Sequence, residues 1–106
     1  MTSKSSLHHD NCPIEQVMDL LGGKWTMLII RDLMPGCLRF SQLQQSLGNI
    51  NPRTLSSRLS ALEESGLVIR RAYAEVPPRV EYSLTDKGRA LLPLFEAIQH
   101  YAEHWL

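Results

Sequence analysis

Along the first half of the chain, apolar residues recur every three or four positions, the spacing of amphipathic helices. The pattern predicts one helix opened by Cys12-Pro13 and a second from about Lys24 to Met34, with Gly22-Gly23 between them. Pro35-Gly36 ends the second helix. A brief strand at residues 37–39 is expected next. A third helix of about two turns follows, with its apolar positions at Phe40, Leu43 and Leu47.

A fourth helix is marked by a capping residue followed by a proline at the first helical position, Asn51-Pro52. Its buried stripe consists of Leu55, Leu59 and Leu62, and Gly66 follows its end. Successive residues of a helix turn by about 100°, so the polar residues lie on the other side. Those that point away are Arg53, Ser56, Ser57 and Ser60, while Thr54 and Arg58 flank the stripe.

Alternating apolar and polar residues then predict two paired strands, the first over about Leu67 to Ala74. In the second, Val80, Tyr82 and Leu84 form the buried face, and Pro77-Pro78 stiffens the connection. Thr85 is expected to cap one long last helix, in which Pro93 predicts a kink or a boundary. The apolar stripe of that helix is broad: Leu91, Leu94, Phe95, Ile98, Tyr101, Ala102 and Trp105.

This order of elements predicts a mainly α fold with a small β-ribbon, an α+β arrangement. The short connection at residues 48–50 makes helices three and four a helix-turn-helix, with the fourth as recognition helix and the paired strands as a wing. The length of 106 residues suits one domain. We expect a flexible N-terminal arm over residues 1–11 and a winged-helix DNA-binding domain over residues 12–106.

Charge changes this picture through its distribution. Eleven basic and eleven acidic residues cancel, but residues 33–62 contain no Asp or Glu and carry Arg39, Arg53 and Arg58. A neutral protein with one acid-free face still binds phosphate, because neutralising contacts are local. No run approaches the roughly 20 apolar residues of a membrane span, and the N-terminus has no apolar segment of a secretory signal. We therefore expect a cytoplasmic protein without membrane contact.

The outer face of the fourth helix is the first candidate for contact with double-stranded DNA. Arg bonds bidentately to guanine in the major groove, while Ser and Thr bond to base edges or phosphates. The alternative is a solvated helix face, for which serines without acids are a poor choice. The candidate residues are Arg53, Thr54, Ser56, Ser57 and Arg58.

Further arginines are candidates outside that helix. Arg79 at the wing tip is expected to enter the minor groove. Arg70 and Arg71 are adjacent on a strand and point to opposite faces, so at most one of them meets the DNA backbone; the other is free to pair with Glu81. Arg39 and Ser41 are placed to hold a phosphate at the start of the third helix.

Taken together, these residues resemble the HxlR family of bacterial winged-helix transcription regulators, relatives of the MarR type. The resemblance covers nearly the whole chain, and the joint order and spacing of its motifs make it specific. Its most specific part is the run from Pro77 to Thr85 followed by Gly88. The other matching motifs are Cys12-Pro13, Gly22-Gly23-Lys24-Trp25, Arg39-Phe40, Leu62-Glu63-Glu64 and Gly66-Leu67.

The resemblance implies a homodimer that binds a pseudo-palindromic operator, more often as a repressor than as an activator. It also implies that the first and last helices are dimerisation helices, a role that the broad apolar stripe of the last helix favours independently. The expected interface residues are Ile14, Val17, Leu94, Phe95, Ile98, Tyr101 and Trp105. In some members, a cysteine before the first helix responds to oxidants or electrophiles.

Cys12 occupies that position, at a helix N-terminus that stabilises a thiolate and near His8, His9 and Lys4 in sequence. The alternatives are a redox sensor or a half-buried thiol with no role. Cys37 is expected to be a core or inert cysteine, with a regulatory pair to Cys12 of the other subunit as the alternative.

The sequence predicts no metal site and no cofactor. His100 and His104 lie one helical turn apart, but no third ligand completes a set, so we interpret them as an exposed pair. The aromatic residues Trp25, Phe95, Tyr101 and Trp105 are expected in the core or the dimer contact, or lining a small effector pocket. An enzyme is disfavoured, because no Gly-rich phosphate loop or catalytic triad order is present. The remaining rival is a winged-helix module that binds other proteins and no DNA; it predicts acids on the outer face of the fourth helix.

Overall fold

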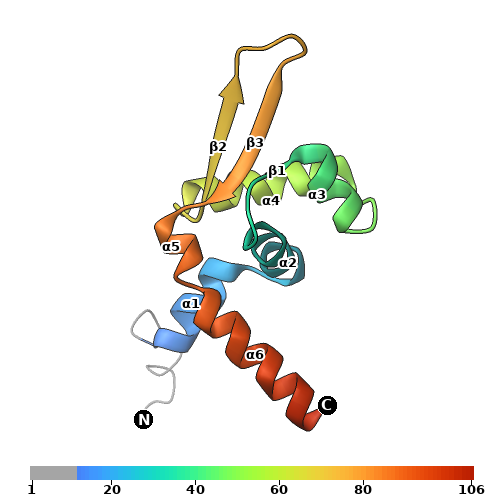
Figure 1. The fold of residues 1–106 in the computed structure, drawn as a ribbon. Coiled ribbons are helices and arrows are strands. Elements are labelled where there is room, and N and C mark those ends of the chain that lie inside the picture. The colour runs from blue at the N-terminus through green and yellow to red at the C-terminus, as the bar shows by residue number, and fades with distance from the viewer. Residues whose placement is uncertain (1–11) are drawn as a thin grey trace.

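The computed structural model describes residues 12–106, and the arm expected at residues 1–11 lies outside the described residues (Figure 1). The elements follow the predicted order and form a winged helix-turn-helix, mainly α with a small sheet. They are α1 (Pro13–Leu21), α2 (Lys24–Leu33), β1 (Leu38–Arg39), α3 (Phe40–Ser46), α4 (Pro52–Glu64), β2 (Val68–Tyr73), β3 (Arg79–Leu84), α5 (Asp86–Arg89) and α6 (Leu92–Trp105).

The core lies where α2, α3, α4 and the base of the wing meet, and it is built from the predicted apolar stripes. Burying each Leu or Ile side chain contributes about 1.5–3 kcal/mol, so the leucines and isoleucines of this core supply most of the stability of the domain. Helices α1 and α6 add little to it: α1 buries only Leu21, and α6 buries no residue fully. The side chains with the least exposure are Ile29, Ile30, Leu33, Leu43, Leu55, Leu59, Leu62 and Leu67.

A tight turn joins α3 to α4 and fixes how the two helices of the helix-turn-helix are connected. Gly48 and Asn49 both have positive φ, at 70° and 59°, which glycine and asparagine adopt more readily than other residues. The Gln44 side-chain amide donates to the carbonyl oxygen of Ile50 at 3.1 Å and ties α3 to the end of the turn. Asn51 then caps α4, because its Oδ1 accepts the backbone N–H groups of Arg53 and Thr54 at 2.8 and 3.3 Å.

The sheet is antiparallel with strand order β1-β3-β2. In its register, Tyr82 of β3 faces Leu38 on one side and Arg70 on the other, and Glu81 faces Arg39 and Arg71. Tyr82 and Leu84 are buried at the base of the wing, as the alternation predicts. The first wing strand, β2, begins one residue later and ends one residue earlier than expected.

The prediction of one helix after Thr85 is wrong, whereas the predicted boundary near Pro93 is confirmed. Thr85 caps the four-residue helix α5, where its hydroxyl accepts the backbone N–H of Gly88 at 3.1 Å. A separate helix, α6, starts at Leu92. Pro93 occupies its first turn, where the missing N–H leaves no helical hydrogen bond unmade. The chain therefore turns between α5 and α6.

The wing and α6 project from opposite sides of the core, with α1 beside the start of α6 (Figure 1). Over residues 12–106, no helix has both the length and the apolar composition to cross a membrane.

Candidate nucleic-acid interface

The outer face of α4 is exposed and cationic. Arg53 and Arg58 are exposed, as are the serines between and after them, whereas Thr54 is half-buried on the flank. Within residues 12–106, neither Arg53 nor Arg58 forms an ion pair. The acids of α4, Glu63 and Glu64, are confined to its last turn. Both guanidinium groups are therefore available to an external anion.

The N-terminal half of this face is also hollowed. A shallow depression of about 420 Å³ lies over the first two turns of α4 and is lined by Asn51, Arg53, Thr54, Ser57 and Arg58. The Asn51 cap fixes the backbone at this end. The sequence predicted four of these five residues as DNA contacts, and α4 brings them together in one place.

Arg39 and Ser41 lie at the start of α3, next to the sheet. Arg39 is the last residue of β1, and its backbone N–H donates to Oε1 of Gln42 at 2.8 Å. Its side chain and that of Ser41 are exposed. Arg39 faces Glu81 in the register but makes no ion pair within residues 12–106.

On the wing, Arg70 and Arg71 are both exposed and point to opposite faces of β2, as predicted. Arg71 lies opposite Glu81 in the register. Glu81 pairs instead with Arg79, so the expected partner of Arg71 or Arg70 is taken by another arginine.

Arg79 is the wing residue whose environment differs most from the expectation. Its Nη2 lies 3.0 Å from Oε2 of Glu75, and its Nη1 lies 3.5 Å from Oε2 of Glu81. The guanidinium carbon also lies 4.1 Å from the centre of the Tyr73 ring. Glu75 and Tyr73 were not predicted from the sequence to contact Arg79. The four-residue spacing from Glu75 to Arg79 is visible in the sequence, but only the folded hairpin brings the two side chains together.

The two cysteines have different surroundings. Cys12 is half-buried at the N-cap position of α1. Cys37 is exposed, and its Sγ donates to Oε1 of Glu81 at 3.5 Å. The expectation of a core position for Cys37 is therefore wrong, because the turn after α2 carries it to the surface of the sheet.

No cluster of three potential metal ligands occurs in the described part of the chain. His100 and His104 stack with ring centres 6.3 Å apart, and both are exposed, as interpreted from the sequence. Trp25 and Phe95 are half-buried against the core, whereas Tyr101 and Trp105 are 60% and 69% exposed.

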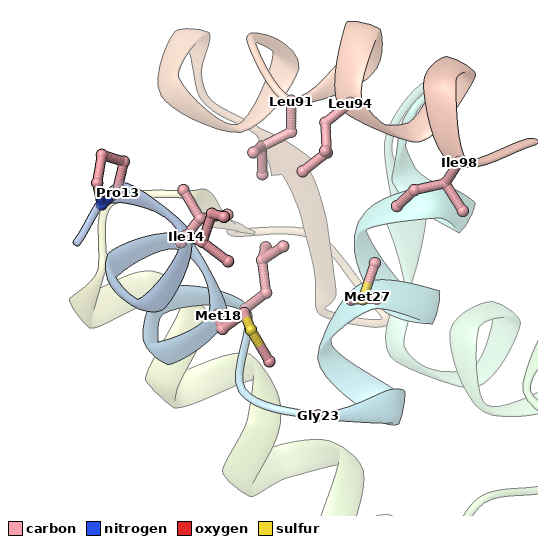
Figure 2. A pocket seen from close by; sticks show the side chains of 10 residues that line it. Pro13, Ile14, Met18, Gly23, Met27, Leu91, Leu94 and Ile98 are labelled. Atoms are coloured by element: carbon pink, nitrogen blue, oxygen red, sulfur yellow. The ribbon is translucent and has the colours of Figure 1, made fainter. Parts of the chain in front are cut away.

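A second, apolar surface lies away from α4, where α1, the start of α2 and α6 enclose a groove of about 700 Å³. Figure 2 shows Ile14 and Met18 of α1 on one side of it, with Leu94 and Ile98 of α6 opposite. Ile14 is 71% and Met18 66% exposed. Such large apolar side chains are rarely left in contact with water over a continuous surface.

A helix-turn-helix whose second helix has a cationic outer face, with its acids confined to the last turn, followed by a two-stranded wing, defines the class of winged-helix DNA-binding proteins. The comparisons with known proteins agree. Residues 20–106 match the family model described as HxlR-like helix-turn-helix. This chain is 44% identical over 95 residues to an HTH-type transcriptional regulator of Synechocystis sp., an alignment that covers 90% of this chain and 70% of that protein.

Solved structures give the same result. A transcriptional regulator from Porphyromonas gingivalis W83, assigned to the MarR family, superposes with a TM-score of 0.86 at 36% identity, covering 92% of this chain and 96% of the other. The redox regulator HypR in its reduced form superposes with a TM-score of 0.81 at 37% identity, covering 87% and 91%. The protein belongs to the HxlR-like helix-turn-helix family of transcriptional regulators, and the predicted family is confirmed. Its relatives are regulators and not enzymes.

Proposed function

We propose that this regulator is a cytoplasmic homodimer that binds a pseudo-palindromic operator and acts as a repressor. The observation that carries the proposal is the exposed face of α4, on which Arg53 and Arg58 have no acidic partner within residues 12–106. In the complex, α4 enters the major groove. The residues that contact bases or phosphates there are Arg53, Thr54, Ser56, Ser57 and Arg58.

Contacts outside α4 fix the position of the protein on the duplex. Arg39 and Ser41, at the start of α3, and Arg70, on the wing, contact phosphates. Arg79 contacts the minor groove or its phosphates, for which it has to leave Glu75 and Glu81. The alternative of a protein-binding module predicted acids on the outer face of α4; the absence of acids from Pro52 to Leu62 favours DNA.

Dimerisation is supported by the exposure of the terminal helices. Helix α6 has 14 residues, and an isolated helix of this length is marginal in water. We propose that the partner subunit covers the groove between α1 and α6. The proposed interface residues are Ile14, Val17, Leu94, Phe95, Ile98, Tyr101 and Trp105. In a dimer, two α4 helices about one DNA turn apart read two half-sites.

A response to oxidants through Cys12 is the finer part of the proposal. It is supported by the half-buried position of this thiol at the N-cap of α1, beside the proposed interface, and by the structural similarity to HypR, which is named a redox regulator. Oxidation at this place would change the packing of α1 and hence the spacing of the two recognition helices.

The experiment is a titration at fixed salt with a duplex that the wild-type protein selects from a random library. Arg53→Ala and Arg58→Ala are expected to weaken binding by about 5- to 150-fold each, the range for losing one bidentate base contact. Arg89→Ala serves as the matched control, because Arg89 is an exposed arginine of α5, outside the proposed interface. Unchanged affinity in both α4 variants would remove α4 as the recognition helix.

A further inference from the structure

The guanidinium group of Arg79 is enclosed on three sides at the tip of the wing. Glu75 and Glu81 pair with its two terminal nitrogens at 3.0 and 3.5 Å, and the Tyr73 ring lies against it at 4.1 Å. As a result, the Arg79 side chain is only 27% exposed, although it lies near the end of a projecting hairpin. We call Tyr73, Glu75, Arg79 and Glu81 the wing-tip cluster.

The hairpin register builds this cluster. Tyr73 and Arg79 are direct partners across β2 and β3, so their side chains share one face of the ribbon. Glu81 lies two residues after Arg79 and shares the same face. Glu75 is turned back toward the cluster, since its backbone N–H donates to the carbonyl oxygen of Tyr73 at 2.9 Å.

Ion pairing distinguishes Arg79 from the neighbouring candidate arginines. Arg39 and Arg71 face Glu81 from both neighbouring strands, yet neither forms an ion pair within residues 12–106. Two carboxylates hold one guanidinium group at the wing tip while Arg79 stays in place. A phosphate that approaches the tip competes directly with Glu75 and Glu81 for the same donors.

The enclosure is weak enough to be exchanged. The Glu75 carboxylate is 48% exposed, and an ion pair with that much access to solvent contributes little. In addition, the buried Nε of Arg79 has no hydrogen-bond acceptor among the described residues, so the cluster leaves one of its donors unsatisfied. A phosphate or a base edge offers acceptors for these donors.

We propose that Glu75 and Glu81 determine specificity by competing with DNA for Arg79. On unrelated DNA the wing fits loosely, and Arg79 stays with its carboxylates and adds nothing to affinity. On the operator, α4 fixes the position of the wing, and Arg79 exchanges its carboxylates for DNA. This inference rests on the proposed DNA-binding function and adds a role for two acids at the interface.

A double-mutant cycle tests the exchange. Wild type, Glu75→Gln, Arg79→Ala and the double variant are titrated with the library-selected duplex and with a scrambled duplex of equal length at one salt concentration. Glu75→Gln is expected to tighten binding to the scrambled duplex by about 2- to 5-fold and to the selected duplex by less, so that specificity falls. In the Arg79→Ala background, Glu75→Gln is expected to have no effect on either duplex.

The control is Glu64→Gln, which removes an equal charge from an exposed residue at the end of α4 that forms no ion pair with Arg79. It is expected to leave the ratio of the two affinities unchanged. Two results overturn the inference while DNA binding stands: Glu75→Gln acts equally with and without Arg79, or Glu75→Gln weakens binding, which makes the cluster purely structural. Failure of the wild-type protein to bind either duplex overturns the proposed function together with this inference.

Discussion

Replacing Gly88 by alanine is expected to destabilise the junction between the wing and the C-terminal helices. A Cβ at this position would lie 2.4 Å from the carbonyl oxygen of Leu67 and 3.1 Å from Cδ2 of Leu84. The first distance has to grow by about 1 Å to reach the 3.4 Å at which ordinary contact begins. The obstacle is backbone and not a flexible side chain, so α5 has to move away from Leu67.

The magnitude follows from the contacts that such a movement breaks. The carbonyl oxygen of Leu67 accepts the backbone N–H of Thr85 at 3.0 Å, a hydrogen bond with a net contribution of about 1 kcal/mol. Overpacking adds about 1–3 kcal/mol, and the smaller backbone entropy of unfolded alanine offsets about 0.4–1 kcal/mol. We therefore expect Gly88→Ala to lower the free energy of unfolding by about 1–3.6 kcal/mol, and Tm by roughly 4–8 °C for each kcal/mol lost.

Urea and thermal unfolding at one protein concentration measure this effect, since a dimer makes stability depend on concentration. Gly36→Ala is the matched control, because a Cβ there meets no atom within 4 Å and the glycine does not have positive φ. It is expected to change stability by less than about 1 kcal/mol. Equal stability of the two variants would refute the close approach of α5 to Leu67.

Three further predictions address the recognition helix, the dimer and the cysteine. Asn51→Ala is expected to lower the free energy of unfolding by about 1 kcal/mol, because two N–H groups of α4 lose their acceptor, while Asn51→Asp keeps the cap; equal urea midpoints for the two variants would contradict this. Ile98→Glu is expected to give a monomer in sedimentation equilibrium, because it buries a charge in the proposed interface, whereas His100→Glu, at an exposed position on the other side of α6, is expected to remain dimeric. A monomeric wild type would rule the interface out. Mild oxidation with hydrogen peroxide is expected to abolish duplex binding by the wild type and not by Cys12→Ser, and equal sensitivity of both proteins would dismiss Cys12 as the sensor.

The sequence alone determined the fold class, the family and the candidate recognition surface. Helical periodicity and end signals are local properties, so α4 was predicted from Asn51-Pro52, its three leucines and Gly66 without any knowledge of its neighbours. The assignment of its outer face follows from the same periodicity, because the side of a helix opposite its apolar stripe is the side left for solvent or DNA.

The tertiary structure decided which groups are free and which are already paired. Arg79 is held by Glu75, Glu81 and Tyr73, whereas Arg53 has no ion pair within residues 12–106. From the sequence, both arginines were equally good candidates for contact with DNA. The exposure of Cys37 was likewise invisible in the sequence, whereas Pro93 gave a local signal for the boundary between α5 and α6. The pairing of Arg79 and the exposure of Cys37 depend on contacts between residues that are distant in sequence or that face each other across a strand register, and periodicity carries no information about such contacts.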